Sequence, residues 1–498
     1  MNNLLYRRQF ILSNKEIDID QSWKKIKLSK ISPDFFLQVH PDLEITRVDR
    51  DSAQVILLGY VIDPYQPKLS TEDIVKELAV LPDYDNLLRK TDTLSGRYAI
   101  IYCDGNSLRL CHDATGFREI YYYNDKQTMV CGSTSKIIAD LFEIPRDNDP
   151  EVIKFFESEV FNRVGRRWIG TRTVYKNIFH LLPNHYLDLI SGKTHRFWPI
   201  AERKEVGLQE ASQTIAEILT GTFDAATRRY KLYQGLTGGW DTRLLLSASR
   251  NYLDKIHFYF IRGMKSDASL GNSPDYVISK SIAEKFGFPI EIVMIENETI
   301  DEEFKKIYYQ NNALSRPSLL PVYYDFSVRK LDDTITVAGS GSNETLRLLS
   351  TIHRNASTGK ALAGEMGYTE FSYVVDSINE WLTETLPLKS KNHRIMDLFS
   401  WEQHFGNWGS LSGSEQDIVR EELRPFNNRK LIAVYNSLPD RYRYKDHPMG
   451  HVATIKMLWK ELLNFDLDMK LPGIKRCLRF FGLEQTADKI LQHVKTLK

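Results

Sequence analysis

Apolar residues follow one spacing in the first 195 residues and another from residue 202 onward. In the first part, short apolar runs such as residues 54–61 and 97–103 alternate with turn residues, which predicts strands of a β meander. In the second part, apolar positions at three- and four-residue steps predict a helix over residues 202–230. The change predicts a β-rich domain over residues 1–200 and an α/β domain over residues 201–498.

The second domain alternates strand and helix candidates. Apolar runs over residues 255–261 and 289–295 flank a predicted helix over residues 276–286, for which Gly287 is the stop signal. Repeated strand-helix-strand order predicts a parallel sheet with right-handed crossovers. Ligands of such sheets bind at the carboxyl ends of the strands, so we expect the chemistry of this chain there.

The overall composition excludes several classes of protein. With 66 Lys and Arg against 65 Asp and Glu, the net charge is +1, which gives no signal for nucleic acid. No apolar run approaches the ~20 residues of a membrane span, and the N-terminal segment is too short and mixed for a signal peptide. We expect a cytoplasmic protein with no nucleic-acid or membrane partner, and a homodimer stays open. Four cysteines without metal-type spacing are expected to be reduced core thiols: Cys103, Cys111, Cys131 and Cys477.

A glycine-containing stretch follows the apolar run that ends at Leu236. Its residues 237–242 read TGGWDT, and a helical run begins at Leu244. A strand, a glycine turn and a helix N-terminus in this order bring backbone N–H groups together, which is an arrangement that binds phosphate. An aspartate in such a loop makes sense if Mg²⁺ lies between it and the phosphates. The alternative is an ordinary glycine turn. The binding positions predicted here are Leu236, Thr237, Gly238, Gly239, Asp241 and Thr242.

A second strand end about a hundred residues later repeats this pattern. Residues 336–347 read TVAGSGSNETLR, so a predicted strand again ends in glycines and a helix is expected to start. Two glycine loops at two parallel strand ends predict one composite site. The candidate positions of the second loop are Gly339, Gly341, Asn343 and Glu344.

Both loops resemble motifs of the N-type ATP pyrophosphatases, in the version of asparagine synthetases and their relatives. TGGWDT resembles the pyrophosphate loop SGGxDS, and the second loop resembles SGEGADELFGG. The N-terminal half resembles class II glutamine amidotransferases, whose motif GxFAFxxxD…LxxxRDxxGxxPLYY is similar to the segment that starts at Ser95. The matching positions there are Asp113, Gly116, Tyr121 and Tyr122.

The resemblance implies a fold, a reaction and roles for single residues. The implied fold is an Ntn-type αββα sandwich, followed by a parallel-sheet adenine nucleotide α-hydrolase-like (HUP-type) domain with helical additions. The implied reaction uses ATP and Mg²⁺ to adenylate a carboxylate. Asp241 and Asn343 would hold the metal, and asparagine in place of the family's aspartate would weaken it. The further implied roles are adenine contact for Phe260, Ile261 and Arg262, and catalysis for Glu344 and Lys470, with Lys475 behind Lys470.

The departures from the amidotransferase pattern argue against glutamine hydrolysis. The family's nucleophile is a cysteine at the N-terminus after methionine removal, whereas this chain has Asn2 and no cysteine before Cys103. The family's acidic residue before GxFAF is Ser95 here. We expect the amidotransferase fold without glutaminase activity.

The sequence therefore predicts an AMP- and pyrophosphate-forming amide ligase. Its substrate would be a small-molecule or peptide carboxylate, coupled to ammonia or to a substrate amine, as in β-lactam synthetases and lasso-peptide cyclases. Two alternatives remain: a glutamine-hydrolysing asparagine synthase and a non-catalytic ATP-binding scaffold. His404 and His451, in the helical last third, are expected to be ordinary polar residues.

Overall fold

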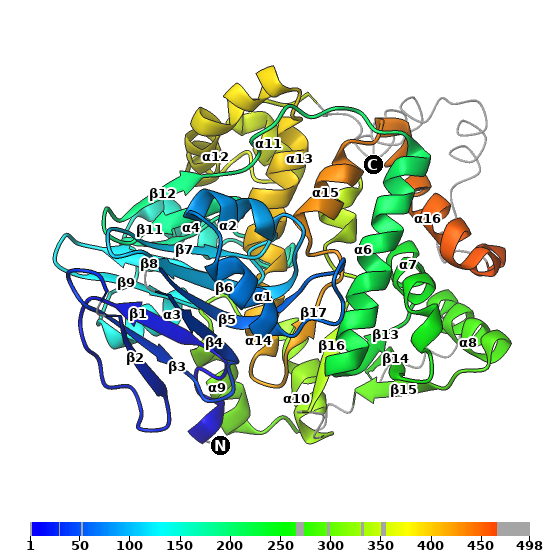
Figure 1. The fold of residues 1–498 in the computed structure, drawn as a ribbon, viewed down its shortest axis with the longest axis horizontal. Helices are drawn as coiled ribbons and strands as arrows, with labels where there is room; N and C mark the ends of the chain where they lie inside the picture. Colours follow the sequence, from blue (N-terminus) through cyan, green and yellow to red (C-terminus); the bar gives the residue numbers. More distant parts are fainter. Residues whose placement is uncertain are drawn as a thin grey trace.

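The computed structural model places the two halves side by side (Figure 1). No helix within its described residues is long and apolar enough to cross a membrane. Lys470, Lys475 and Cys477 lie outside the described residues. The structure describes residues 2–28, 30–50, 53–264, 273–295, 299–329, 333–349 and 355–465.

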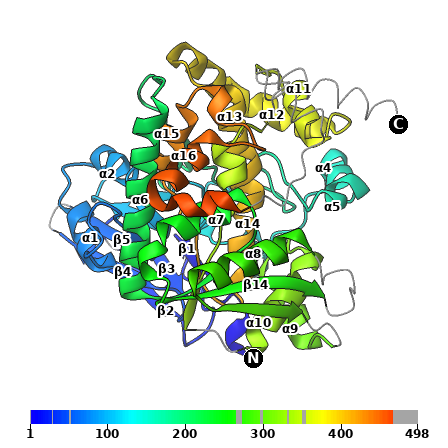
Figure 2. The ribbon, with the colours of Figure 1, turned by 90° about the vertical axis from the view of Figure 1, so that its right-hand side faces the viewer.

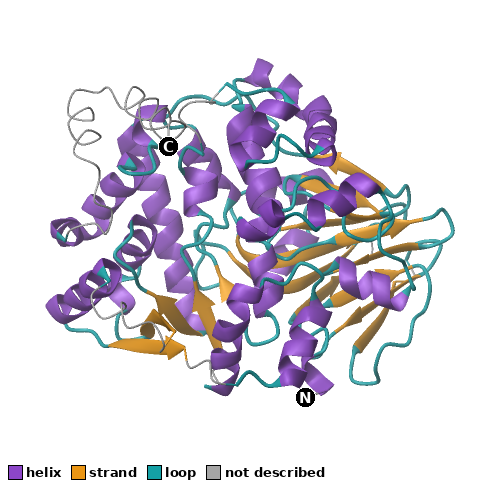
Figure 3. Ribbon diagram, turned by 180° about the vertical axis from the view of Figure 1, so that it is seen from behind, coloured by secondary structure: helices purple, strands orange, loops and turns teal. Residues whose placement is uncertain are grey.

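The N-terminal half is a sandwich of two six-stranded antiparallel sheets (Figure 3). Apolar side chains from both sheets meet between them, among them Leu12, Leu37, Ile56 and Ile101. The first sheet has the order β10 (Ile178–His180), β8 (Tyr121–Asn124), β9 (Met129–Gly132), β1 (Phe10–Ser13), β3 (Phe35–Val39) and β2 (Lys24–Leu28). The second has the order β12 (Lys193–Arg196), β11 (His185–Asp188), β7 (Leu108–His112), β6 (Ser95–Cys103), β5 (Gln54–Ile62) and β4 (Ile45–Asp49).

Helices cover both outer faces of this sandwich. Helices α1 (Thr71–Ala79) and α2 (Tyr84–Thr91) bury their apolar faces against the second sheet. A capping box fixes the start of α1: Ser70 accepts from the Asp73 backbone and Asp73 accepts from the Ser70 backbone. On the first sheet lie α3 (Ser135–Leu141) and α4 (Pro150–Phe156), followed by α5 (Glu159–Arg163). The predicted αββα layering is confirmed.

The C-terminal half is built on a five-stranded parallel sheet (Figure 2). Its order is β15 (Ile290–Ile295), β14 (Ile256–Met264), β13 (Lys231–Gly235), β16 (Thr334–Val337) and β17 (Glu422–Leu423), with every pair parallel. One face packs on α6 (Leu208–Arg229), α7 (Trp240–Ala248), α8 (Pro274–Phe286) and α16 (Met449–Trp459). The other face packs on α9 (Glu302–Asn311) and α10 (Leu320–Val328). The predicted fold class is therefore confirmed, from the sandwich to the parallel sheet.

Further helices lie between and above these sheets. Helices α11 (Gly359–Met366) and α12 (Ser372–Thr385) share the core of the first sandwich sheet. After α13 (Ile395–Leu398), residues Phe399–Gly409 form a π-helix, which leads into α14 (Leu411–Gln416). Helix α15 (Arg429–Asn436) packs on α6. Long π-helical segments are rare and frequently mark functional sites.

Three helix starts differ from the prediction, and the first is that of α6, which begins at Leu208 rather than at residue 202. Helix α7 begins at Trp240 rather than Leu244, because Gly239 already has the extended backbone of an N-cap residue. Asp241 thus lies in its first turn. Within the described residues, the second glycine loop is followed by a π-helical turn, Ser342–Leu346, rather than by an α-helix.

Candidate functional site

The two glycine loops leave neighbouring strands and contact each other. Strands β13 and β16 pair in parallel, so both loops emerge at the same edge of the sheet. A Cβ added at Gly339 would lie 3.3 Å from the Cβ of Asp241 and 3.6 Å from Cγ2 of Thr242. The close approach explains the glycine, and it brings Asp241 of the first loop against the second loop.

The first loop is held closed by its own hydroxyl groups. Thr242 Oγ1 donates to the Thr237 carbonyl oxygen at 2.9 Å and accepts from the Thr237 backbone N–H at 3.2 Å. The Gly239 backbone N–H donates to Thr237 Oγ1 at 3.3 Å. The loop therefore presents the N-terminus of α7 in a preformed turn, where the helix dipole favours negative charge.

A carboxylate already occupies one anion-binding group of this loop. Asp275, in the first turn of α8, accepts a hydrogen bond from the backbone N–H of Gly238. A Cβ at Gly238 would lie 2.9 Å from that same carboxylate oxygen, so only glycine allows the contact without movement. The contact shows that this loop accommodates an oxyanion.

Asp241 lies at the centre of a buried network. Its Oδ2 accepts from Nη2 of Arg347 at 2.7 Å. Its Oδ1 lies 3.3 Å from Nε2 of His451, and that nitrogen is engaged at 2.7 Å with Ser342 Oγ. Burial raises the pKa of Asp241, but the contacts with His451 and Arg347 outweigh burial and hold the pKa below its ordinary value. Asp241 is therefore a carboxylate at neutral pH.

His451, on α16, is a buried member of this network. Its exposed fraction is 0%, and the hydroxyl of Tyr435 lies 2.6 Å from its Nδ1. Burial lowers the pKa of His451, so the ring is neutral near pH 7. With the Tyr435 hydroxyl donating to Nδ1, Nε2 carries the proton that faces Ser342 and Asp241. The expectation that His451 is an ordinary polar residue of the helix stays a prediction, whereas its burial in this network had no signal in the sequence.

The predicted metal ligands are only partly assembled. Among the described residues, no group of three or more His, Cys, Asp and Glu side chains could hold a metal ion. Asn343 Nδ2 donates to Glu344 Oε1 at 3.2 Å, and Asp241 Oδ1 is buried without a hydrogen bond of its own within that part of the chain. Mg²⁺ is usually held by one or two carboxylates plus substrate phosphates, and this donor set fits that mode.

Basic side chains surround Glu344. Lys445 lies near Glu344, Arg347 and Arg167, and burial lowers its pKa although Glu344 opposes the change. His404, on the π-helix, is 3% exposed; burial and the neighbouring charges of Arg167 and Lys445 lower its pKa to about 3. Neither ring nitrogen of His404 has a partner in the described structure. No signal in the sequence indicates that His404 is buried beside Arg167 and Lys445, because no local pattern separates it from an exposed polar helix residue.

The π-helix contacts the second loop directly. Gly341 has φ +97°, and a Cβ there would lie 2.8 Å from the ring of Phe405. Ser400 Oγ donates to the carbonyl oxygen of Glu344. The π-helix thus fixes the turn that carries Asn343 and Glu344 and brings His404 to the same side.

The remaining predicted binding positions line the neighbouring strand. Phe260 is 7% exposed and its ring lies 5.7 Å from that of Tyr276, which makes it mainly a packing residue. Ile261 is half-buried at a register irregularity near the carboxyl end of β14. Leu236 is buried, and its backbone N–H donates to the Tyr259 carbonyl oxygen at 2.9 Å. Arg262 lies over the ring of Tyr276. Their role toward adenine stays a prediction.

In the N-terminal half, the other half of the chain covers the strand ends where glutaminase chemistry would lie. Ser95, at the start of β6, is fully buried and its Oγ accepts from Asn428 Nδ2 at 3.1 Å. The Tyr60 hydroxyl donates to the Glu422 carbonyl oxygen at 2.7 Å. A Cβ at Gly221 of α6 would lie 1.9 Å from the Pro64 carbonyl oxygen.

Buried ion pairs complete this contact between the halves. Arg97 donates to both carboxylate oxygens of Asp417, at 2.6 and 2.8 Å, and also pairs with Glu421. Arg118 Nη2 donates to Glu421 at 2.6 Å. Ahead of β1, Arg8 donates to the Asp417 carbonyl oxygen at 2.7 Å. These charges are paired with each other.

Comparison with known proteins leaves the function to be argued from the site. No family model and no curated protein matches the chain. Among solved structures, the chain is similar to glutamine phosphoribosylpyrophosphate amidotransferase from B. subtilis, complexed with ADP and GMP, at 10% identity and TM-score 0.24; the alignment covers 61% of this chain and 66% of that one. It is also similar to the NH3-dependent NAD synthetase from Campylobacter jejuni in complex with nitrate, at 12% identity and TM-score 0.21, over 42% and 96% of the two chains. NMN synthetase from Francisella tularensis is similar at 12% identity and TM-score 0.21, and the alignment covers 43% of this chain and 97% of that one.

Proposed function

We propose that this chain is an ATP-dependent amide ligase that forms AMP and pyrophosphate. In this proposal, residues 1–200 are an amidotransferase-like domain without glutaminase activity, and residues 201–498 carry the ligase site. The observation that supports it most is the meeting of the two strand-end loops, which places the buried Asp241 carboxylate against the second loop, with Oδ1 facing His451 Nε2 at 3.3 Å.

The proposed reaction has two steps. A substrate carboxylate oxygen would attack the α-phosphorus of ATP; the new O–P bond forms, the bond from that phosphorus to the bridging oxygen of the β-phosphate breaks, and pyrophosphate leaves. An amine nitrogen then attacks the acyl carbon, the bond to AMP breaks, and the nitrogen gives up one proton. The product is an amide.

Residues of the first loop would serve the leaving group. The backbone N–H groups of Gly238 and Gly239, together with the first turn of α7, would stabilise the charge that develops on pyrophosphate. The Asp275 carboxylate accepts the hydrogen bond of the Gly238 N–H, so phosphate could bind this N–H only after that hydrogen bond breaks. Asp241 would supply the metal ligand of the loop, with Asn343 and Glu344 from the second loop.

The basic side chains near Glu344 favour an acidic substrate. Lys445 has no ion pair within 4 Å in the described part of the chain, and Arg167 Nε is likewise buried without a partner there. A substrate that carries a second anionic group beside the reacting carboxylate would satisfy both. We therefore propose a dicarboxylate or an acidic peptide as the substrate class.

A non-catalytic scaffold remains the second candidate, because Arg347 already neutralises Asp241 at 2.7 Å. Pyrophosphate exchange into ATP separates the two. The protein is incubated with Mg²⁺, ATP, labelled pyrophosphate and a panel of monocarboxylates, dicarboxylates and peptides. We expect exchange that requires a carboxylate and is fastest with dicarboxylates or acidic peptides. Binding of ATP without exchange for any acid would support the scaffold instead.

Nitrogen supply gives an independent test. With the strand ends of β5 and β6 covered and Ser95 buried, glutamine should not be hydrolysed with or without ATP. Asn2→Cys should not restore hydrolysis, because the pocket residues also differ. Stoichiometric glutamate release from either protein would refute this part of the proposal.

A further inference from the structure

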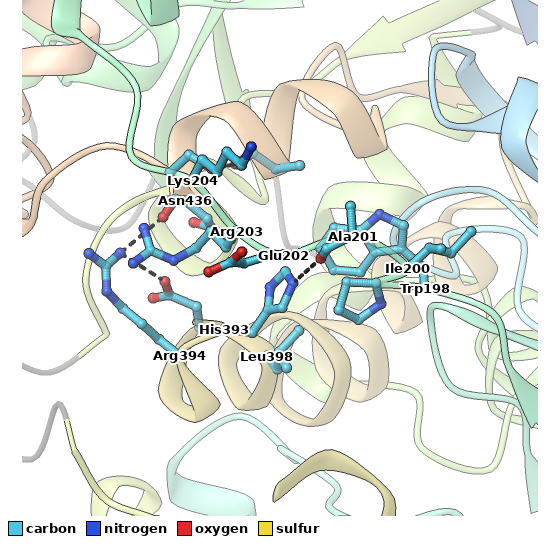
Figure 4. A pocket seen from close by; sticks show the side chains of 14 residues that line it. Trp198, Ile200, Ala201, Glu202, Arg203, Lys204, His393, Arg394, Leu398 and Asn436 are labelled. Carbon is cyan, nitrogen blue, oxygen red and sulfur yellow. Dashed lines mark hydrogen bonds and ion pairs between the residues drawn. The ribbon is translucent and has the colours of Figure 1, made fainter. Parts of the chain in front are cut away.

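A separate cavity lies where the connection between the halves crosses the helical region (Figure 4). Its volume is about 200 Å³. The connecting residues 198–204 form one wall, and the N-terminal end of α13 and the C-terminal end of α15 form the other. Because ligand pockets of drug size span roughly 300–1,000 Å³, this one suits a small metabolite rather than a peptide.

Arg203 brings an uncompensated positive charge to this cavity. Its Nε donates to the Asn392 carbonyl oxygen at 2.7 Å, while its Nη1 is buried and has no hydrogen-bond partner within the described residues. No carboxylate lies within 4 Å of its guanidinium in that part of the chain. Burial and the neighbouring charge of Arg394 lower the pKa of Arg203. A buried donor without a partner is costly, and a bound acceptor would remove that cost.

Arg394 adds positive charge beside Arg203, and its own hydrogen bonds are largely made. Figure 4 shows the two guanidinium groups next to each other at one side of the cavity. Arg394 donates to the Asn436 carbonyl oxygen at 2.9 Å and pairs with Asp440 at 3.0 Å. The nearby carboxylate of Asp397 is committed to Arg443, at 2.7 and 3.0 Å. Glu205 pairs with Arg394 at 3.9 Å, and Asp397 and Glu205 raise the pKa of Arg203 only from beyond ion-pair distance, so Arg203 has no direct carboxylate partner among the described residues.

The other groups around the cavity limit the ligand further. Glu202 accepts a hydrogen bond from the side-chain amide of Asn392, and Lys204 also lines the cavity. His393 donates from Nε2 to the Ala201 carbonyl oxygen at 2.9 Å, and burial lowers its pKa, so it presents a neutral ring. Apolar surface comes from Trp198, Pro199, Ile200, Leu398 and Ala433.

We propose that this cavity binds a small organic anion, with its carboxylate or phosphate group on Arg203 and its apolar body against Trp198 and Leu398. The site lies outside the proposed ligase site and does not depend on the proposed function. A negatively charged oxygen would accept the missing hydrogen bond from Arg203 Nη1 and offset the repulsion between Arg203 and Arg394. Hydrogen bonds between charged groups are stronger than those between neutral groups.

The cavity is also connected to the second glycine loop. The Asp397 carboxylate, next to Arg394, orients Arg443, and Arg443 Nε donates to the Leu346 carbonyl oxygen at 2.9 Å. The Arg443 carbonyl oxygen in turn accepts from the Leu348 backbone N–H at 3.1 Å. An anion that draws Arg394 from Asp397 changes the charge that holds Arg443. The proposal therefore includes an effect of the ligand on residues 342–349.

Binding can be measured on the full chain without ATP. Ligand-observed NMR titrations use benzoate and phenyl phosphate as probes, benzyl alcohol as the neutral analogue, and inorganic phosphate as the anion without an apolar body. We expect both aromatic anions to bind and Arg203→Gln to weaken them by roughly tenfold or more. Arg163→Gln, at an exposed arginine of α5, is the matched control and should bind as the wild type does.

Each result decides part of the proposal. No binding of either aromatic anion at tens of millimolar, or equal binding of benzyl alcohol, would overturn the anion site. Preference for phenyl phosphate or for benzoate identifies which anionic group the site takes, and inorganic phosphate binding as tightly as phenyl phosphate would overturn the role of the apolar wall. Hydrogen exchange of residues 342–349 should change with the bound anion in the wild type and not in Arg203→Gln. Unchanged exchange in the wild type would overturn the connection to the loop.

Discussion

Two regions of this molecule bury charged side chains at strand ends, and they differ in how those charges are matched. At the contact between the halves, Arg97 makes two hydrogen bonds to Asp417 and also pairs with Glu421, and Arg118 pairs with Glu421. The side chains of Arg97, Arg118, Asp417 and Glu421 pair with one another there, and only Arg118 Nε among their atoms lacks a hydrogen-bond partner in the described structure. That region needs no ligand to be stable.

At the carboxyl ends of β13 and β16, the matching is incomplete. Arg347 Nε and both ring nitrogens of His404 are buried without hydrogen-bond partners among the residues the structure describes. Each buried polar group without a partner costs about 1–3 kcal/mol. This difference supports the proposal that the first region is structural, whereas the second takes a ligand that supplies the missing hydrogen-bond partners.

The largest expected effect is on stability, at the contact between the halves. Arg97→Met leaves Asp417 buried without its partner, and breaking a buried pair in this way costs about 3–5 kcal/mol. Denaturant unfolding should show this loss. Arg228→Met, which removes an exposed pair with Asp224 on α6, is the control and should be far milder. Equal losses for the two variants would contradict the comparison.

The next effect is on catalysis. Asp241→Asn removes the carboxylate that lies against both loops, so we expect Mg²⁺-dependent exchange to fall by roughly a hundredfold or more, which is about 2.7 kcal/mol or more in the barrier. The measurement is pyrophosphate exchange on protein shown to be folded by circular dichroism. Asp254→Asn, at an exposed aspartate, should exchange as the wild type does. Normal exchange by a folded Asp241→Asn would move the site elsewhere.

A third effect comes from a carboxyl group at the contact between the halves. Burial raises the pKa of Glu119 to about 7, although Ser414 and Tyr121 donate hydrogen bonds to it. Because the folded pKa lies above the unfolded value, its contribution to stability is complete below the unfolded value near 4.5 and is lost as pH rises through about 7. Stability should fall by about 2 kcal/mol across this window.

Glu119→Gln is the variant that tests this pH dependence, because the amide does not titrate. Chemical unfolding at several pH values between 5 and 7 should show a flatter profile for Glu119→Gln than for the wild type. If the two profiles are parallel, another group carries the dependence.

A smaller effect is expected at His404, in the region at the carboxyl ends of β13 and β16. His404→Leu removes two ring nitrogens that lack partners in the described structure, so stability should stay within about 1 kcal/mol of the wild type or rise. Exchange should nevertheless fall by roughly tenfold if the ring contacts substrate. Trp408 stacks on His404, and tryptophan fluorescence reports whether that packing survives. A large stability loss with normal exchange would make His404 structural.

Local patterns in the sequence predicted the elements whose signals are local. Strands β5 and β6 fall on the predicted runs 54–61 and 97–103, and α8 is followed by the C-cap Gly287, whose left-handed φ of +73° glycine permits. Strands β2 and β4 were not predicted, because they lie at sheet edges and expose much of their length, so their apolar pattern is weak. Buried cysteines in strands β6, β7 and β9 agree with the expectation of core thiols.

The site was predicted only as far as its loops. The glycines and Asp241 can be recognised from the sequence, because they follow an apolar run and precede a helical one. The network is completed by Arg347, Tyr435 and His451, which lie between 106 and 210 residues after Asp241 in the sequence. No local sequence pattern marks these three residues. Their contribution depends on how the sheet and α16 pack, which is a property of the tertiary fold.

The last prediction tests how the two loops share a metal. Asn343→Asp adds a carboxylate beside Glu344, and a further negative ligand strengthens a site for a hard cation. If the chain is an active ligase that holds Mg²⁺ between Asp241 and this loop, the variant should need several-fold less Mg²⁺ for half-maximal pyrophosphate release. Asn343 also donates to Glu344 at 3.2 Å, and the variant loses that hydrogen bond, so thermal stability without Mg²⁺ should fall slightly. A Mg²⁺ titration of wild type and variant measures the first effect and thermal unfolding the second. A scaffold would show the stability change and gain no turnover, whereas a higher Mg²⁺ requirement would place Asn343 away from the metal.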